Sequence, residues 1–225
     1  MSKYLYETHL HTYPVSKCAK GGVRESLEFY KKQGYAGVFI TNHFLDGNIN
    51  IDRSLLYKDR LDFYFSDYKE AVAIGRELGI SVFLGVEMSD WGTDFLVYGL
   101  SMEWYYEHPE IEGMDRVLQL KLLAESGALI IHAHPFRGYD CMKLFPKHVH
   151  GVEVYNGGRT DFENAMALQY AENYGLIHFA GTDNHSAGQQ QSVGGMRSDR
   201  PIKDERDFCE MIKQGQMSLF KIESR

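Results

Sequence analysis

The sequence predicts an α/β protein in which a largely parallel sheet closes, or nearly closes, into a barrel. Short runs of β-branched and aromatic residues alternate along the chain with longer amphipathic stretches, as in successive β-α units. Histidine or acidic residues stand at, or just past, the ends of several of these short runs. The length of 225 residues lies in the range of one α/β barrel.

Helices are expected where apolar residues recur at helical spacing. Over 23–33, Val23, Leu27 and Tyr30 share one face, and Gly34 is expected to end the helix. The same reasoning predicts further helices over 59–78, 115–126, 162–174 and 204–214. The apolar runs between them predict strands over 4–10, 36–41, 80–87, 94–100, 128–132, 151–155, 177–182 and 217–222.

The composition indicates a protein of the cytoplasm. No linker, repeat or low-complexity tract divides the chain, so we expect one domain over 1–225. The net charge of −7 argues against a nucleic-acid-binding surface. The first residues have no apolar signal core, and no apolar run reaches the ~18 residues of a membrane span. Three widely spaced cysteines form no disulfide framework and suit a reducing compartment.

The residues at the strand ends predict a metal centre. His9 and His11 are two apart, so on a strand their side chains point to the same face. In a parallel barrel the functional groups gather at the carboxyl ends of the strands. Imidazole and carboxylate ligands suit Zn²⁺, Mn²⁺ or Fe, and their number here predicts two or three ions. Such clusters support metal-assisted hydrolysis. The candidate ligands are His9, His11, His43, Glu87, His134, Asp183 and His185.

This ordered set of residues resembles the PHP (polymerase and histidinol phosphatase) family. The motifs are His9-x-His11, Thr41-Asn42-His43, Gly85-Val86-Glu87, His134-Pro135-Phe136 and Gly181-Thr182-Asp183-Asn184-His185. The resemblance implies a distorted seven-stranded (β/α) barrel that holds two or three metals and hydrolyses phosphate esters. It also implies that His9, His11, Glu87 and Asp183 hold the first metal. Glu87 would bridge to a second metal bound by His134, and His43 and His185 would hold a third.

Two positions depart from the family pattern. The family usually has a carboxylate or a histidine a few residues after the first histidine pair, but 13–18 contains neither. The third metal therefore lacks a usual ligand. One interpretation is that Cys18 replaces the missing ligand as a thiolate. A second is that the charge of Lys17 occupies the position of the third metal, and a third is that this metal site is only partly occupied. Asn42 stands where the family has aspartate, which weakens a group that orients a ligand.

Further candidates surround these motifs. Arg137 directly follows His134-Pro135-Phe136, and its guanidinium is expected to bind substrate phosphate, with a surface ion pair as the alternative. Arg159 and Arg197 lie in glycine-rich segments and are weaker candidates on the same rim. Glu153 is expected either to complete the second metal or to hydrogen-bond a ligand. His132 is expected to be a buried, hydrogen-bonded histidine rather than a ligand.

The sequence therefore predicts a metal-dependent phosphoesterase acting on a small phosphorylated metabolite. Glu87, Asp183 and Arg137 are the expected catalytic residues. A histidinol-phosphatase-like enzyme, a nucleotide phosphoesterase and a phosphotyrosine phosphatase all fit these residues. One alternative is an amidohydrolase-type C–N or ester hydrolase, although those barrels usually bridge their metals with lysine rather than glutamate. The other alternative is a catalytically silent metal-binding domain. The sequence does not define an oligomeric state.

Overall fold

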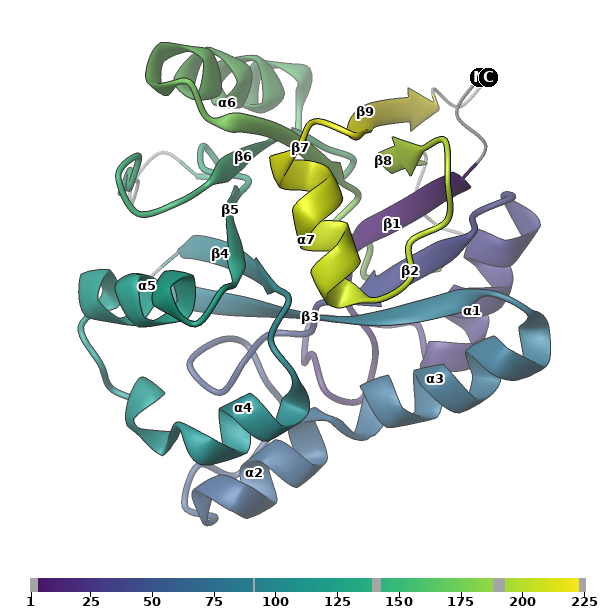
Figure 1. The fold of residues 1–225 in the computed structure, drawn as a ribbon. Coiled ribbons are helices and arrows are strands. Elements are labelled where there is room, and N and C mark those ends of the chain that lie inside the picture. The colour runs from purple at the N-terminus through teal and green to yellow at the C-terminus, as the bar shows by residue number, and fades with distance from the viewer. Residues whose placement is uncertain (1–3, 91, 139–142, 188–192, 223–225) are drawn as a thin grey trace.

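The computed structural model describes residues 4–90, 92–138, 143–187 and 193–222. In this part of the chain, nine strands form one sheet (Figure 1). The strands are β1 (Tyr4–Leu10), β2 (Gly37–Ile40), β3 (Ser81–Asp90), β4 (Thr93–Tyr98), β5 (Leu129–Ala133), β6 (Gly151–Asn156), β7 (Ile177–Gly181), β8 (Val193–Ser198) and β9 (Met217–Ile222). The helices are α1 (Val23–Lys32), α2 (Tyr57–Tyr64), α3 (Ser66–Leu78), α4 (Met102–Glu107), α5 (Arg116–Glu125), α6 (Asp161–Tyr174) and α7 (Glu205–Lys213), with a short 3₁₀ helix at Pro109–Ile111.

The strand order is β7-β6-β5-β4-β3-β2-β1-β8-β9. β1, β2 and β3 are mutually parallel, as are β5, β6 and β7. β4 runs antiparallel between these two groups, and β8 runs antiparallel to both β1 and β9. The expected α/β barrel architecture is present, but the expected seven-strand count is not confirmed. β1 to β7 form a contiguous row, and the antiparallel pair β8–β9 extends that row within the described residues.

The sheet curls into a nearly closed barrel because the segment after β7 returns to β1. Leu10 and Asn184 form an isolated parallel bridge between these segments. The His11 amide donates to the Asn184 carbonyl at 3.0 Å, and the Asn184 amide donates to the His9 carbonyl at 3.3 Å. These bonds join the two ends of the seven-strand row at its carboxyl edge.

Aromatic side chains fill the other end of the barrel. Phe208 of α7 packs against Phe39, Tyr98 and Phe179, with ring centroids 4.3, 5.3 and 6.2 Å away. Phe208 is fully buried, and Cys209 of the same helix belongs to the same apolar cluster. Figure 1 shows α7 lying across the sheet beside β1 and β4. α7 therefore closes the end of the barrel opposite to the carboxyl ends of β1 and β3.

The long helix expected over 59–78 is divided at Phe65 into α2 and α3. Phe65 is fully buried and packs against Tyr64 and Tyr105, which redirects the chain at this residue. α2 contacts α4, whereas α3 contacts α1. No helix in the described ranges is long and apolar enough to cross a membrane.

The strand β8 was not expected from the sequence because its Gly194-Gly195 pair reads as a loop. At Gly195, φ is +141°, and an added Cβ would lie 2.1 Å from the carbonyl oxygen of Tyr6 on β1. Only glycine permits this close approach of the two backbones. The glycine pair is therefore part of the strand pairing and does not mark an irregular loop.

Candidate metal centre

Buried imidazoles and carboxylates gather at the carboxyl ends of the barrel strands. His9 and His11 lie at the end of β1, Glu87 lies on β3, His134 follows β5 and Asp183 follows β7. All five residues are at most 6% exposed. The two β1 Nε2 atoms are 3.2 Å apart and lie 3.2 and 3.4 Å from the Glu87 oxygens. They lie 3.5 and 3.3 Å from Asp183 Oδ1. Nε2 of His134 is 3.3 Å from Glu87 Oε1.

An irregularity in β1 aims its histidines into the barrel. Tyr6 packs in the interior cluster, so regular alternation would direct the even-numbered side chains inward. The pairing of β1 with β2 shifts register between Glu7 and Leu10. After this bulge the odd-numbered side chains face inward, and His9 and His11 reach the cluster.

Two of the cluster residues have left-handed backbone conformations. His134 has φ +26° and Asp183 has φ +54°. Such conformations are unfavourable for residues other than glycine and are concentrated at functional sites. At His134 this conformation turns the side chain into the barrel. His132 faces the outer side of β5, and regular alternation would place His134 on that side too.

Several buried polar atoms of the cluster have no hydrogen-bond partner among the described residues. They are both oxygens of Glu87, Oδ1 of Asp183, both ring nitrogens of His134 and Nδ1 of His43. Buried polar atoms are nearly always paired, so unpaired carboxylates and imidazoles that face one another indicate a missing cation. Their donor set of nitrogen and oxygen atoms fits Zn²⁺, Mn²⁺ or Fe.

Four groups of side chains offer ligand atoms that lie within 4.8 Å of one another. His9, His11, Glu87 and His134 each occur in two of these groups, so the groups share ligand residues and form one continuous cluster. The groups are His9–His11–Glu87, His9–His134–Asp183, Glu87–Asp94–His134 and His11–His43–His185. The structure thus brings together all seven ligands expected from the sequence.

The electrostatics of the cluster are those of tightly packed opposite charges. Burial raises the pKa of Glu87, but His43, His11 and His9 outweigh it and hold that pKa well below its usual value. Burial lowers the pKa of His43, but Glu87 outweighs it and raises the pKa to about 10. Burial lowers the pKa of His11 to about 3, with nearby His43 acting in the same direction.

Hydrogen bonds behind the cluster fix the orientation of three imidazoles. Nδ1 of His9 is 2.9 Å from Glu153 Oε1, and Nδ1 of His11 is 3.0 Å from Ser16 Oγ. Nδ1 of His185 is 2.7 Å from the carbonyl oxygen of Asp183. With Nδ1 engaged in each ring, Nε2 is left as the ligand atom. Glu153 also accepts the backbone amide of His134 at 3.0 Å, so it hydrogen-bonds two candidate ligand residues.

Asn42 organises this support through its side-chain amide. Its Oδ1 accepts the Thr12 amide at 2.7 Å and the Ser16 hydroxyl at 2.9 Å. Its Nδ2 donates to Thr12 Oγ1 at 2.9 Å and to Asp67 Oδ2 at 3.2 Å. Asn42 therefore holds the Ser16 hydroxyl that contacts His11.

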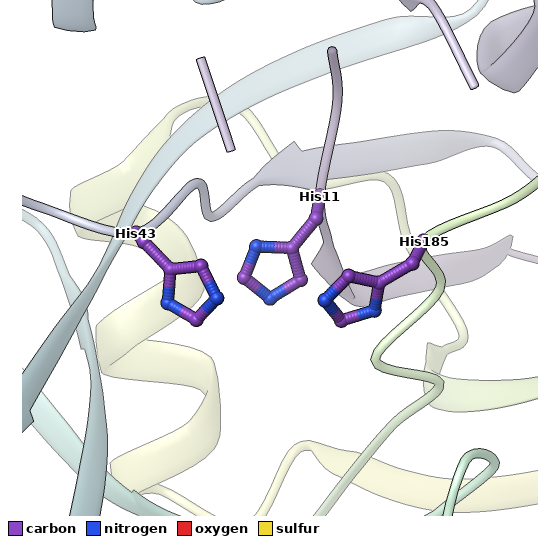
Figure 2. Close-up of side chains that lie close together, drawn as sticks. All are labelled: His11, His43 and His185. Atoms are coloured by element: carbon purple, nitrogen blue, oxygen red, sulfur yellow. The ribbon is translucent and has the colours of Figure 1, made fainter. Parts of the chain in front are cut away.

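A second face of the cluster consists of histidines from three separate segments (Figure 2). His43 follows β2, His11 ends β1 and His185 lies beyond β7. The His11 ring centroid is 4.4 Å from that of His43 and 4.3 Å from that of His185. Cys18 lines the same cavity as His43 and His185. Burial raises the pKa of the Cys18 thiol, but His185 and His43 outweigh it and lower the pKa to about 6.

Asp94 is a candidate ligand that the sequence reasoning missed. It is 3% exposed, and its Oδ2 lies 3.8 Å from His134 Nε2. It begins β4, and the start of a strand is the wrong end for function in a parallel barrel. β4 is antiparallel, however, so its first residues lie at the carboxyl end of β3. β3 ends at Asp90, and β4 begins at Thr93, with which Asp90 pairs. A connection this short joins antiparallel strands, so the spacing is the sequence signal for the reversed direction of β4.

The three candidate arginines lie in different places. Arg137 is 41% exposed, its Nη1 is 3.7 Å from Asp94 Oδ2, and it lines a cavity of about 690 Å³ with His43 and His185. Arg159 follows β6, and its Nε is buried without a hydrogen-bond partner in the described part of the chain. Arg197 pairs with Leu5 at the other end of β1, so the structure does not bring it to the cluster.

His132 is buried as expected, but the expected hydrogen bond is absent. Neither of its ring nitrogens has a partner among the described residues. The ring stacks on Phe95 at 5.1 Å and meets Tyr170 edge-on at 5.9 Å. Burial lowers its pKa to about 3, so it is a neutral packing residue outside the metal-ligand groups.

A family model described as PHP-associated matches residues 161–217. The fold is similar to that of a two-domain protein from Bacteroides vulgatus that contains a predicted PHP-like metal-dependent phosphoesterase. The TM-score is 0.67 at 15% identity, over 96% of this chain and 64% of that one. The chain thus spans about two thirds of that protein. These matches confirm the resemblance to PHP proteins.

Two further structures share the fold. One is a putative metal-dependent phosphoesterase from Bifidobacterium adolescentis, with a TM-score of 0.56 at 14% identity over 93% of this chain and 96% of that one. The other is an amidohydrolase from Chromobacterium violaceum with bound sulfate and no metal. Its TM-score is 0.54 at 15% identity over 95% of this chain and 97% of that one. No curated protein matched the sequence.

Proposed function

We propose that this protein is a metal-dependent phosphoesterase that hydrolyses a small phosphorylated metabolite. The observation that carries the proposal is the set of buried, unpaired carboxylate and imidazole atoms beside a cavity of about 690 Å³. Burying charged and polar atoms without hydrogen-bond partners costs free energy. Bound cations would offset that cost in this cluster. The similarity of the fold to PHP-like proteins supports the same class of reaction.

In this proposal the cluster holds two or three divalent ions. His9, His11, Glu87 and Asp183 would hold the first ion, and Glu87 and His134 would hold a second. Asp94 adds a carboxylate on the side of the second ion, as its distance from His134 indicates. When bound, such ions polarise a phosphoryl oxygen and activate water near neutral pH.

The protein side chains then position the substrate. Arg137 lines the cavity and is partly exposed, so its guanidinium is free to turn from Asp94 toward a phosphate group. The cavity volume suits a ligand of metabolite size. Histidinol-phosphate-like compounds, nucleotides and phosphotyrosine all carry the required phosphate ester.

The alternative of an amidohydrolase-type enzyme is less well supported by the centre itself. Such barrels usually place a lysine between the two metals. Here the central position is occupied by Glu87, which lies within 3.4 Å of His9, His11, His43 and His134. A carboxylate at this point supports the phosphoesterase assignment.

The proposal is tested by metal analysis and turnover on one preparation. Plasma mass spectrometry should find at least two Zn, Mn or Fe per chain, and p-nitrophenyl phosphate turnover should disappear on chelation and return with Mn²⁺ or Zn²⁺. Asp183→Ala should lose metal and turnover together. Asp199→Asn is the matched control, because Asp199 follows β8 at the opposite end of β1 and is exposed. Full turnover in the Asp183 variant, or metal-loaded protein without turnover, would refute the proposal.

A further inference from the structure

Glu153 on β6 is a fully buried carboxylate whose two oxygens contact different parts of the cluster. Oε1 lies 2.9 Å from Nδ1 of His9, and Oε2 accepts the backbone amide of His134 at 3.0 Å. On their other sides, Nε2 of His9 and Nε2 of His134 lie 3.2 and 3.3 Å from Oε1 of Glu87. Glu153 therefore supports, from behind, a candidate ligand of each of two adjacent ions.

The contacts of Glu153 are not those of a metal ligand. Among the described residues, it occurs in none of the four groups with metal-ligand spacing. Both of its oxygens are engaged in hydrogen bonds, whereas both oxygens of Glu87 lack hydrogen-bond partners in the described part of the chain. Of the two roles expected from the sequence, these contacts favour the one in which Glu153 holds ligand residues.

The hydrogen bonds around Glu153 permit only one direction. The backbone amide of His134 can only donate. Oδ1 of Asn156 accepts the amide of Gly158 at 2.8 Å, which turns Nδ2 of Asn156 toward Glu153 Oε2, 2.8 Å away. Two fixed donors thus meet Oε2, and Oε1 is left to accept from His9. Because an ionised carboxylate has no proton to give, His9 carries a proton on Nδ1, and Nε2 is the atom left for a metal ion.

The contact with His134 holds an unusual backbone conformation. His134 has φ +26°, which is unfavourable for residues other than glycine. The hydrogen bond from its amide to Glu153 Oε2 offsets part of this conformational cost. Loss of that acceptor should therefore release a ligand of the second ion as well.

We infer that Glu153 is a positioning residue that prepares two metal sites together, by fixing the proton of His9 on Nδ1 and by holding the backbone of His134. The inference rests on the proposed function in that the cluster is taken to bind two adjacent ions. It adds a link between these ions that is independent of Glu87, since Glu153 joins them through hydrogen bonds and not as a ligand.

Substitution by glutamine should separate the two roles of Glu153. An amide has one oxygen and one NH₂ group, so it cannot accept hydrogen bonds at both ends. The fixed donors of His134 and Asn156 should take the oxygen, and the NH₂ group should then face Nδ1 of His9. A neutral His9 ring would then carry its proton on Nε2, where the proton blocks the metal ion. Glu153→Gln should thus impair the first site and spare the second.

Zinc titration in competition with a chromophoric chelator tests this pattern without relying on activity. Glu153→Gln should bind one zinc ion per chain about 10–100-fold more weakly than the wild type and the other ions equally well. Glu153→Ala offers no acceptor to His9 or His134 and should weaken two ions. Glu172→Gln is the matched control with unchanged affinities, because Glu172 lies exposed on α6.

A second substitution should turn the glutamine around. In Glu153→Gln/Asn156→Asp, a carboxylate at position 156 can accept the NH₂ group and still accept the Gly158 amide. The glutamine oxygen is then free to face His9, and the weakened zinc ion should regain most of its affinity. A merely structural loss would not be reversed by a second substitution that moves the charge.

Equal zinc affinities of Glu153→Gln and the wild type would overturn the inference, as would an equal loss for every ion or a double variant as weak as the single one. Glutamine satisfies the two fixed donors, so metal-free Glu153→Gln should give the circular dichroism spectrum of the folded barrel. An unfolded variant would also count against the inference.

Failure of this inference is distinguishable from failure of the proposed function. If the wild-type protein binds zinc and hydrolyses phosphate esters but Glu153→Gln binds every ion as tightly, the role of Glu153 is wrong and the phosphoesterase remains. If the affinity pattern is found without chelator-sensitive hydrolysis, the role of Glu153 remains and the phosphoesterase is wrong. A wild-type protein that binds no zinc would overturn both.

Discussion

Glu7 gives the most informative perturbation of this structure, because a fully buried carboxylate supports the metal centre from behind. Its Oε1 accepts the amides of Thr8, His9 and Thr182 at 2.9, 2.8 and 3.0 Å. Its Oε2 accepts the Thr182 hydroxyl at 2.6 Å. These bonds fix the backbone next to two candidate ligands, His9 and Asp183.

Replacing Glu7 by alanine removes an acceptor from the buried amides of Thr8, His9 and Thr182 and from the Thr182 hydroxyl, which still lies 2.8 Å from the Tyr30 hydroxyl. An unsatisfied buried donor costs about 1–3 kcal/mol, and entering water would recover part of that cost. We expect Glu7→Ala to lower the unfolding free energy by about 3–5 kcal/mol and to weaken metal binding. Glu7→Gln keeps the shape of the side chain and one acceptor oxygen. At low pH it should therefore lower the unfolding free energy less than Glu7→Ala does.

The pH dependence separates the charge of Glu7 from its shape. Burial raises the pKa of Glu7 from 4.5 to about 7, against the hydrogen bonds from Thr182 and His9. When the pKa of an acid is higher in the folded state than in the unfolded state, the protonated acid stabilises the fold. For Glu7 this stabilisation is complete below the unfolded pKa of about 4.5. That stability is lost as the pH rises through about 7. The unfolding free energy of the wild-type protein falls by about 3 kcal/mol in total. A glutamine at this position does not titrate, so the variant keeps its stability over the same pH range.

The assay is urea denaturation of metal-free wild-type protein and Glu7→Gln at pH values from 5 to 8. Because all other titrating groups are shared, the difference between the two proteins isolates Glu7. Glu7→Gln should gain about 2.5 kcal/mol relative to the wild type between pH 5 and pH 8, because a small part of the total is already lost at pH 5. A difference that stays constant with pH would refute the reasoning, as would a Glu7→Ala protein as stable as the wild type.

Three further predictions concern the centre and its cavity. His9→Ala should lose bound metal and phosphatase activity while circular dichroism shows a folded barrel; full activity would contradict the ligand assignment. Arg137→Ala should raise KM for a phosphate ester about tenfold or more with unchanged metal content, since a charge-assisted bond is worth about 1.5–3 kcal/mol; an unchanged KM would remove Arg137 from the substrate site. At Gly181 an added Cβ would lie 2.5 Å from His9 Cβ and 2.8 Å from Glu153 Oε1, so Gly181→Ala should cost about 1–3 kcal/mol in thermal denaturation; a wild-type melting temperature would show that the site is less tightly packed.

The sequence was sufficient for the parts of the site that depend on simple alternation and strand ends. Glu87 lies on a strand whose Phe83 and Glu87 face inward while Leu84 and Val86 face outward, so period-two reasoning predicts its direction. His9 and His11 also converge as predicted. They do so only because the bulge in β1 changes which side chains face inward, and a bulge leaves no clear mark in one sequence.

Other features depended on chain direction and backbone conformation. Asp94 was missed because a reversed strand exchanges the functional and non-functional ends, and an apolar run has the same pattern in either direction. The β8 strand was missed because glycine pairs have low strand propensity, and here the strand depends on close backbone contact with Tyr6. The Phe65 bend was missed because the residues around it retain helical spacing.

The bridge between Leu10 and Asn184 has a consequence for the biosynthesis of the protein. It joins the first strand to a segment more than 170 residues later, and the candidate ligands span the same interval. At about 5–20 residues per second, a ribosome needs roughly 10 to 30 seconds to pass from His11 to Asp183. During that time the nascent chain carries its first histidine pair with no aspartate to oppose it. The proposed first metal site would therefore be complete only after Asp183 has been synthesised.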